Sequence, residues 1–142
     1  MTQTSKLISI CIPVFNEAAN LPIAVAAVEE VFKKALPGYR LEIIVTDNAS
    51  TDHTWRVAQE LASARSNLRA FRFSRNFGYQ ASIFAGLSLA KGDAVIELDA
   101  DLEDPPRVIP EFVRKWEEGY QVAYGVRATR QAPLLMKLVF SS

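Results

Sequence analysis

Short runs rich in valine, isoleucine and leucine alternate along this chain with longer stretches in which apolar residues recur every three or four positions. The short runs predict β-strands and the longer stretches predict amphipathic helices. Almost continuous apolar content is typical of parallel strands that helices cover on both faces. The pattern therefore predicts an α/β fold with a mostly parallel sheet. Five strands are predicted, at residues 7–13, 41–46, 68–73, 94–98 and 121–124.

Helices are predicted between these strands. The third of them is expected to bury Ile83, Phe84 and Leu87 against the sheet. Pro105 and Pro106 are typical of a helix start and open the fourth. The four helices are predicted at residues 21–35, from 51 or 52 onward, at 79–90 and from 105 to 118.

Composition excludes several classes of protein. The chain has 142 residues, of which 49% are hydrophobic, so it buries a core without disulfide or metal staples. Sixteen basic and sixteen acidic residues give no net charge, which argues against a nucleic-acid-binding domain. The single cysteine, Cys11, lies in an apolar run and is expected in the core. The apolar stretches 7–15 and 134–140 are shorter than the roughly 20 residues that span a bilayer.

Polar side chains follow each of the first four predicted strands. In an open parallel sheet, ligands bind in the crevice beyond the carboxyl ends of the strands, so these residues are the candidate site. They lie in four segments, 13–17, 47–52, 74–78 and 99–104.

The densest of these segments belongs to an acidic run that places six carboxylates in the twelve residues 93–104. Asp99 and Asp101 are two residues apart and so lie on the same side of an extended segment. Such a pair can share Mg²⁺ or Mn²⁺, which leave positions open for substrate phosphates. The alternative is a solvated acidic turn in which Glu103 or Asp104 caps the next helix. The position of Asp99 and Asp101 at the end of a predicted buried strand favours the metal site.

Asp47 is the second candidate, because a carboxylate between a strand and a small-residue turn can accept hydrogen bonds from a nucleobase or ribose. The alternative is a turn-forming Asx residue. His53, the only histidine, falls in the first turn of a predicted helix and is interpreted as a surface or capping residue. The sequence has no glycine-rich dinucleotide motif, no P-loop and no serine nucleophile elbow.

Taken together, these segments resemble the catalytic domain of family 2 glycosyltransferases, in the branch that acts on polyprenyl phosphates. The resemblance covers nearly the whole chain and implies a GT-A fold, which is Rossmann-like. The segments are specific when taken together in this order and spacing, whereas a short D-x-D motif alone is not. The matching segments are residues 9–17, 47–54, 75–78, 97–106 and 125–127.

The resemblance also implies roles for individual residues. Asp99, Asp101 and Glu103 would hold the metal, and Asp99, Asp101 and Arg127 would act in catalysis. Glu103 stands where this branch usually has glutamine, and Asn48 stands where the family usually has a second aspartate. The nucleotide would contact Pro13, Phe15, Glu17, Asp47, Asn76 and Asp99.

The function that the resemblance implies is an inverting, metal-dependent transfer of a sugar from a UDP- or GDP-linked donor to a polyprenyl phosphate at the cytoplasmic membrane face. A polyprenyl phosphate oxygen is already ionised near neutral pH and needs no general base, whereas a sugar hydroxyl does. Two alternatives stay open: transfer to a sugar hydroxyl in surface-polysaccharide synthesis, and a non-catalytic nucleotide-binding module.

Two regions are predicted. Residues 1–132 form the N-terminal part of a nucleotide-sugar-binding GT-A domain, and residues 133–142 begin an amphipathic interface helix. A last helix packed on its own domain is the alternative for the second region. Members of this branch are longer, so the chain is expected to be C-terminally incomplete, weakly active by itself, soluble, and associated through the apolar residues of 134–140.

Overall fold

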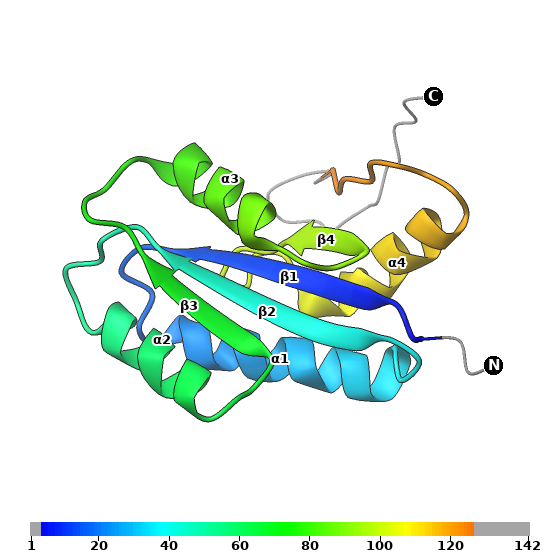
Figure 1. Cartoon of the computed structure of the whole chain (residues 1–142), viewed down its shortest axis with the longest axis horizontal. Coiled ribbons are helices and arrows are strands. Elements are labelled where there is room, and N and C mark those ends of the chain that lie inside the picture. The colour runs from blue at the N-terminus through cyan, green and yellow to red at the C-terminus, as the bar shows by residue number, and fades with distance from the viewer. Residues whose placement is uncertain (1–3, 127–142) are drawn as a thin grey trace. The chain divides into compact units, whose positions relative to one another are not determined.

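The computed structural model describes residues 4–126, and within this range four parallel strands form one sheet (Figure 1). The strand order is β3-β2-β1-β4, so β1 is a central strand, and its Cys11 is level with Ile44 of β2 and Glu97 of β4. The predicted mostly parallel sheet is confirmed. The strands are β1 (Leu7–Val14), β2 (Arg40–Asp47), β3 (Leu68–Arg72) and β4 (Ala94–Glu97).

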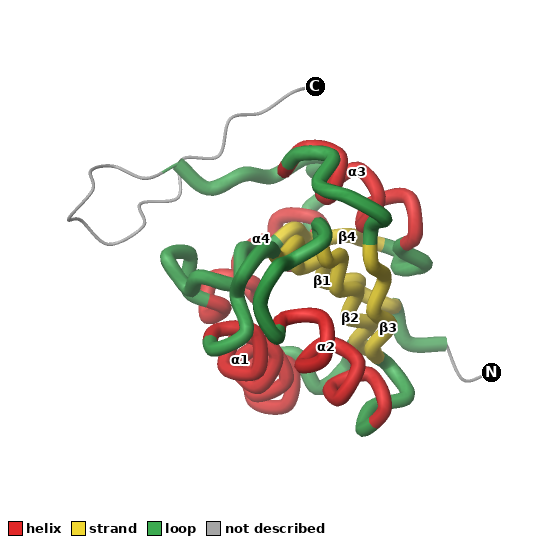
Figure 2. The backbone as a smooth tube through the Cα atoms, turned by 90° about the vertical axis from the view of Figure 1, so that its left-hand side faces the viewer, coloured by secondary structure: helices red, strands yellow, loops and turns green. Residues whose placement is uncertain are grey.

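Helices cover both faces of this sheet. Figure 1 shows α1 (Asn20–Ala35) and α2 (Thr54–Ser63) on one face and α3 (Tyr79–Leu89) on the other, and Figure 2 shows the same layers end on. The side chains of Ile8, Ile10 and Ile12 are fully buried within β1. Cys11 is buried as predicted, and this burial, with the nearby charges of Glu42 and Glu97, raises the pKa of its thiol to about 12.

The α3 helix turns a different side to the sheet from the one that the sequence predicts. Its buried residues are Ser82 and Gly86, whereas Phe84 is 72% exposed and Leu87 is 45% exposed. A Cβ atom on Gly86 would lie only 3.1 Å from Cys11 Cβ. The small residues therefore let α3 approach the sheet closely, and Phe84, two positions and about 200° around the helix from Gly86, is turned away.

A buried network ties the connection between α3 and β4 to the strands. Glu42 accepts hydrogen bonds from Ser9 Oγ (2.5 Å), Arg69 Nη2 (2.6 Å) and the Lys91 backbone N–H (2.9 Å). Ser9 Oγ in turn accepts the Gly92 N–H at 2.8 Å. Burial by itself raises the pKa of Glu42, but these hydrogen bonds and the Arg69 charge outweigh it and lower that pKa. The network fixes the entry of β4 into the sheet.

The described part of the chain divides into two units at residue 106, and the second contains the helix α4 (Ile109–Glu117). A 3₁₀ turn (Pro106–Val108) precedes α4, so the α-helix begins later than the two prolines predicted. The predicted strand at 121–124 is wrong: these described residues form no strand, and Val122 is 66% exposed. Length alone does not explain this difference, because β4 is also four residues long and pairs with β1.

Candidate functional site

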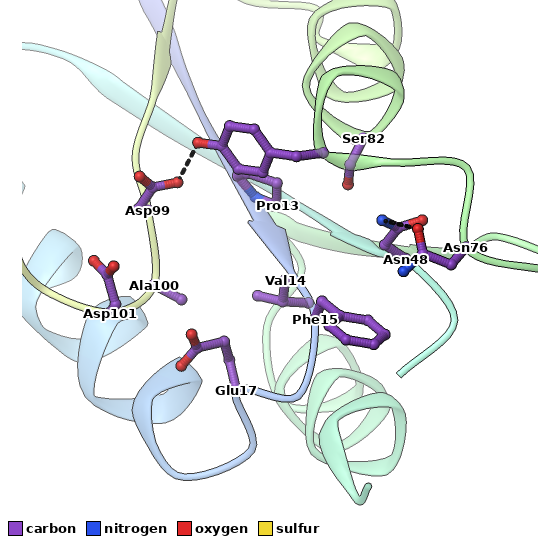
Figure 3. A pocket seen from close by; sticks show the side chains of 11 residues that line it. Pro13, Val14, Phe15, Glu17, Asn48, Asn76, Ser82, Asp99, Ala100 and Asp101 are labelled. Atoms are coloured by element: carbon purple, nitrogen blue, oxygen red, sulfur yellow. Dashed lines mark hydrogen bonds between the residues drawn. The ribbon is translucent and has the colours of Figure 1, made fainter. Parts of the chain in front are cut away.

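A pocket of about 340 Å³ lies at the carboxyl ends of the strands, where the sequence places the candidate site (Figure 3). Its wall is mixed: in Figure 3 the carboxylates of Asp99, Asp101 and Glu17 point in from one side, and the Phe15 ring and two asparagines stand on the other. The lining residues are Pro13, Val14, Phe15, Glu17, Asn48, Asn76, Tyr79, Ser82, Asp99, Ala100 and Asp101.

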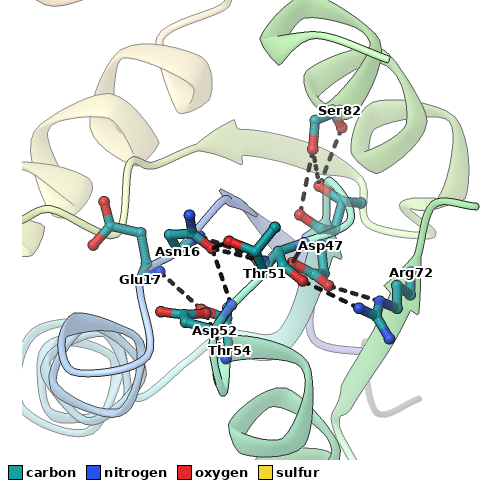
Figure 4. A network of polar contacts seen from close by, with 10 residues as sticks. Asn16, Glu17, Asp47, Thr51, Asp52, Thr54, Arg72 and Ser82 are labelled. Atoms are coloured by element: carbon teal, nitrogen blue, oxygen red, sulfur yellow. Dashed lines mark hydrogen bonds and ion pairs between the residues drawn. The ribbon is translucent and has the colours of Figure 1, made fainter. Parts of the chain in front are cut away.

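Asn16 joins the loop after β1 to the loop after β2 (Figure 4). Its Oδ1 accepts the backbone N–H groups of Thr51 (2.8 Å) and Asp52 (3.3 Å), and its own N–H donates to Ser50 Oγ at 2.9 Å. The Glu17 N–H likewise donates to Thr54 Oγ1 at 2.8 Å. These bonds hold the loop that carries Phe15 and Glu17 at the pocket.

Asp47 is fully buried and is not among the lining residues. Its Oδ1 accepts hydrogen bonds from the backbone N–H and the hydroxyl of Ser50, three residues on, so Asp47 stabilises the turn that follows β2. Its Oδ2 lies 3.3 Å from Arg72 Nε, and Figure 4 draws this ion pair as a dashed line. A role for Asp47 in contacting the nucleoside stays a prediction.

Asn48 and Asn76 form a polar wall of the pocket. Asn48 Nδ2 donates to Asn76 Oδ1 at 3.0 Å, and Asn48 Oδ1 accepts the Phe77 N–H at 2.9 Å. Asn76 Oδ1 also accepts the Gly78 N–H at 2.8 Å. The backbone N–H groups fix the orientation of both amides. Asn76 therefore lines the pocket together with Asn48, and its contact with a nucleotide stays a prediction.

The acidic corner stands opposite this wall. The Tyr79 hydroxyl lies 2.5 Å from Asp99 Oδ1, the bond drawn at Asp99 in Figure 3, and 3.0 Å from Glu97 Oε1. Desolvation raises the pKa of Glu97 and Asp99 adds to that rise, whereas the Tyr79 hydrogen bond opposes it. Desolvation and the two carboxylates also raise the pKa of Tyr79. The phenol therefore stays protonated and serves as a donor.

Asp101 lies in a tight turn, in which its Oδ1 accepts the Glu103 N–H at 3.0 Å and Leu102 has a φ of 61°. Glu103 is exposed and is not among the lining residues. Within residues 4–126 no three acidic, histidine or cysteine side chains gather into a group that could hold a metal. Two carboxylates at a pocket nevertheless suit Mg²⁺ or Mn²⁺, which take one or two protein carboxylates and complete their shell with substrate phosphates.

Some predicted residues lie elsewhere. Arg127 and the segment 133–142 fall outside the described residues. His53 is exposed at the N-cap position of α2, as interpreted from the sequence. Sequence reasoning missed Tyr79 and Ser82 as pocket residues. The available signal was that Tyr79 directly follows a strand-end loop, at the start of a helix.

The amino-acid sequence was compared with family models and with curated proteins. The sequence model of the family described as Glycosyl transferase family 2 matches residues 9–135. The chain is 41% identical over 127 residues to an undecaprenyl-phosphate 4-deoxy-4-formamido-L-arabinose transferase of Pseudomonas savastanoi, covering 89% of this chain and 37% of the relative. It is 38% identical over 123 residues to a prophage bactoprenol glucosyl transferase homolog of Escherichia coli, covering 87% and 40%.

A solved structure has a similar fold at low sequence identity. The mannosyltransferase PcManGT of Pyrobaculum calidifontis, in complex with GDP-mannose and Mn²⁺, aligns with a TM-score of 0.65 at 23% identity, covering 82% of this chain and 33% of that one. The chain thus spans about two fifths of the length of the curated relatives that it matches. No helix among residues 4–126 is long and apolar enough to cross a membrane.

Proposed function

Because the chain belongs to glycosyl transferase family 2, we propose that it moves a sugar, with inversion, from a nucleotide-sugar donor to a polyprenyl phosphate at the cytoplasmic face of a membrane. The observation that carries the donor half of this proposal is the strand-end pocket. It presents Asp99 and Asp101 on one side and an aromatic and amide wall on the other.

In this proposal the donor lies with its base and ribose along Pro13, Phe15 and Asn76. The exposed part of the Phe15 ring, 44% of the residue, supplies an apolar surface for the base. Glu17 and the asparagines offer hydrogen-bonding groups beside it. Asp47, buried behind this wall, supports the loop, and a direct contact of Asp47 with the nucleoside would need its turn to open.

Asp99 and Asp101 would hold Mg²⁺ or Mn²⁺, with Glu103 as the third predicted ligand. The bound cation supplies neutralisation of the charge that builds on the departing nucleoside diphosphate. The two aspartates thereby set where the diphosphate lies, and the loop pair joined by Asn16 sets where the nucleoside lies. Arg127 is proposed to contribute positive charge toward a phosphate of the acceptor or the departing nucleotide.

The acceptor half of the proposal draws on the relatives. The names of two of them specify undecaprenyl phosphate and bactoprenol. A phosphate acceptor is already ionised near neutral pH, so no general base has to be found among the pocket residues. The residues from 133 onward are proposed to associate with the membrane surface. They are also proposed to bring copies of the chain together.

The test of the donor half is a calorimetric titration of the protein with UDP, GDP and their sugar conjugates, in Mn²⁺ and in chelator. We expect one nucleotide class to bind more tightly with Mn²⁺ and Asp101→Asn to lose that metal-dependent gain. Asp93→Asn is the matched control: it lies at the opposite end of β4, where Asp93 Oδ2 accepts the Leu7 N–H, a bond that asparagine can keep. Nucleotide affinity that is equal with and without Mn²⁺ would instead indicate a non-catalytic nucleotide-binding module.

The test of the acceptor half is sugar transfer from the bound nucleotide class to undecaprenyl phosphate, compared with undecaprenol and with free oligosaccharides. Transfer to the phosphate alone is the expected result. Transfer to an oligosaccharide hydroxyl would replace the lipid assignment with polysaccharide synthesis and would leave the donor assignment intact.

A further inference from the structure

One phenol group at the pocket lies within hydrogen-bond distance of two carboxylates. The Tyr79 hydroxyl is 2.5 Å from Asp99 Oδ1 and 3.0 Å from Glu97 Oε1. A hydroxyl has a single hydrogen to donate, so it donates to one carboxylate at a time, and the other carboxylate remains available as an alternative acceptor. Glu97 is the last residue of β4 and Asp99 lies two positions beyond it, and both carboxylates face the Tyr79 hydroxyl.

The base of the Tyr79 side chain is held firmly on the protein. Asn76 Oδ1 accepts the N–H of Gly78, which has a φ of 93° and directly precedes α3. One turn into the helix, the Ser82 and Thr46 hydroxyls lie 2.9 Å apart in the buried layer against β2. The first turn of α3 is therefore fixed at two points, and the phenol extends from it toward the end of β4.

The chemistry of a phenol suits this position. Glu97, Asp99 and Asp101 place three carboxylates within five residues. A lysine or arginine at the position of Tyr79 would orient Asp99 but would also compete with a cation for its charge. A neutral hydroxyl orients the carboxylate and leaves its negative charge available.

Resting on the proposed function, we propose that Tyr79 is a positioning residue for the metal-binding carboxylate Asp99, and that Glu97 is the second acceptor to which its hydroxyl turns when Asp99 shifts toward a cation. The hydroxyl keeps an acceptor in both states. Asp99 can therefore move without leaving the donor unsatisfied, and its orientation before the cation binds is already restricted.

The first experiment measures the dissociation constant of Mn²⁺ for the protein, in the presence of whichever of UDP or GDP binds, from the electron paramagnetic resonance signal of free Mn²⁺. Removing hydrogen-bond partners of metal ligands typically weakens metal binding about 10- to 100-fold, and we expect Tyr79→Phe to do so. Tyr39→Phe is the matched control, because Tyr39 directly precedes β2 at the opposite end of the sheet. Tyr79 is 52% exposed, so loss of its hydroxyl should leave the thermal midpoint of the metal-free protein unchanged.

A second readout reports on the phenol directly. If the hydroxyl changes partner, adding Mn²⁺ and nucleotide to the wild-type protein changes the ultraviolet absorption of tyrosine. This change should persist in Tyr39→Phe and be absent in Tyr79→Phe. Glu97→Gln keeps an acceptor oxygen, so we expect its Mn²⁺ affinity to fall less than that of Tyr79→Phe.

The outcomes separate this inference from the function on which it rests. Wild-type protein that binds nucleotide independently of Mn²⁺ would remove the metal site and the inference together. Wild-type protein that binds Mn²⁺ and Tyr79→Phe protein that binds it equally well would overturn the inference alone. So would the absence of any tyrosine signal on addition of Mn²⁺ to the wild type, a measurement that does not depend on how well the variant folds.

Discussion

At the scale of single residues, three non-glycine residues with left-handed backbone conformation stand in the loops that build the pocket. Asn16 (φ 53°), Ala49 (φ 58°) and Leu102 (φ 61°) follow β1, β2 and β4 respectively. Asparagine tolerates this conformation, whereas a residue such as alanine is destabilised in it by about 1–2 kcal/mol. Unfavourable conformations that persist in folded proteins cluster at functional sites. The residues with positive φ therefore lie in the same loops, after β1, β2 and β4, as the polar side chains of the candidate site.

The variant Ala49→Gly tests whether the left-handed conformation of Ala49 destabilises the folded chain. Glycine adopts a positive φ without strain but gains entropy in the unfolded chain, so we expect a net stabilisation of about 0.5–1 kcal/mol. The free energy of unfolding in urea measures it. Ala26→Gly, on the exposed side of α1, should change stability in the opposite direction by about 1 kcal/mol. A destabilised Ala49→Gly protein would show that the loop does not hold residue 49 in the left-handed region.

At the scale of elements, close approach rather than apolar patterning decides how α3 and β4 meet the sheet. Gly86 lets α3 contact Cys11, and Gly92 lets the connection into β4 pass against Ser9. Helix periodicity identified α3 but not its buried side, because three large apolar residues suggested one face while two small residues occupy it. A sequence shows which positions are apolar, and the backbone separation that selects small residues appears only in the folded chain.

Gly92→Ala should disturb the entry of β4. A Cβ atom there would lie 2.5 Å from Ser9 Oγ and 2.7 Å from the Ser9 backbone nitrogen, which is closer than real side chains approach. We expect a loss of about 1–3 kcal/mol, as in other overpacked sites, measured by thermal or urea unfolding. Gly38→Ala is the control, because nothing lies within 4 Å of its added Cβ. Equal stabilities of the two variants would contradict the tight passage at Gly92.

At the scale of the whole sheet, the buried Glu42 network joins β1, β2 and β3 to the connection between α3 and β4. Its carboxylate has a pKa lower in the folded chain than in the unfolded chain, where glutamate titrates near about 4.3. The stabilisation that it gives is therefore fully present above that value and is lost as the pH falls through the folded-state pKa.

Glu42→Gln removes this pH-dependent stabilisation. At neutral pH we expect the variant to unfold about 1.5–3 kcal/mol more easily, the usual range for hydrogen bonds to a charged group. The difference from the wild type should shrink as the pH falls below about 4. Urea unfolding at a series of pH values measures it. Glu30→Gln, an exposed position on α1, is the control and should have little effect. A stability difference that stays constant with pH would contradict the charged state of Glu42.

The sequence predicts most strands of this sheet and part of the candidate site. The first four strands agree within about a residue of their predicted ranges, whereas the run 121–124 forms no strand although β4 is equally short. Whether so short a run pairs depends on a neighbouring strand that the local sequence does not reveal. The strand-end position of Asp99, Asp101 and Asn76 followed from parallel topology alone. The burial of Asp47 depends on how its loop turns, and the partnership of Tyr79 with Asp99 joins residues twenty positions apart. Neither has a local signal.

The eight residues of β2 separate two tasks along a single strand. Glu42, which braces the sheet, and Asp47, at the ligand end, are five residues and roughly 17 Å apart at the usual rise of a strand. Substitutions around the pocket can therefore accumulate at one end of the strand while the Glu42 network at the other end stays unchanged. A sheet arranged in this way can change its pocket without losing the contacts that hold its strands together.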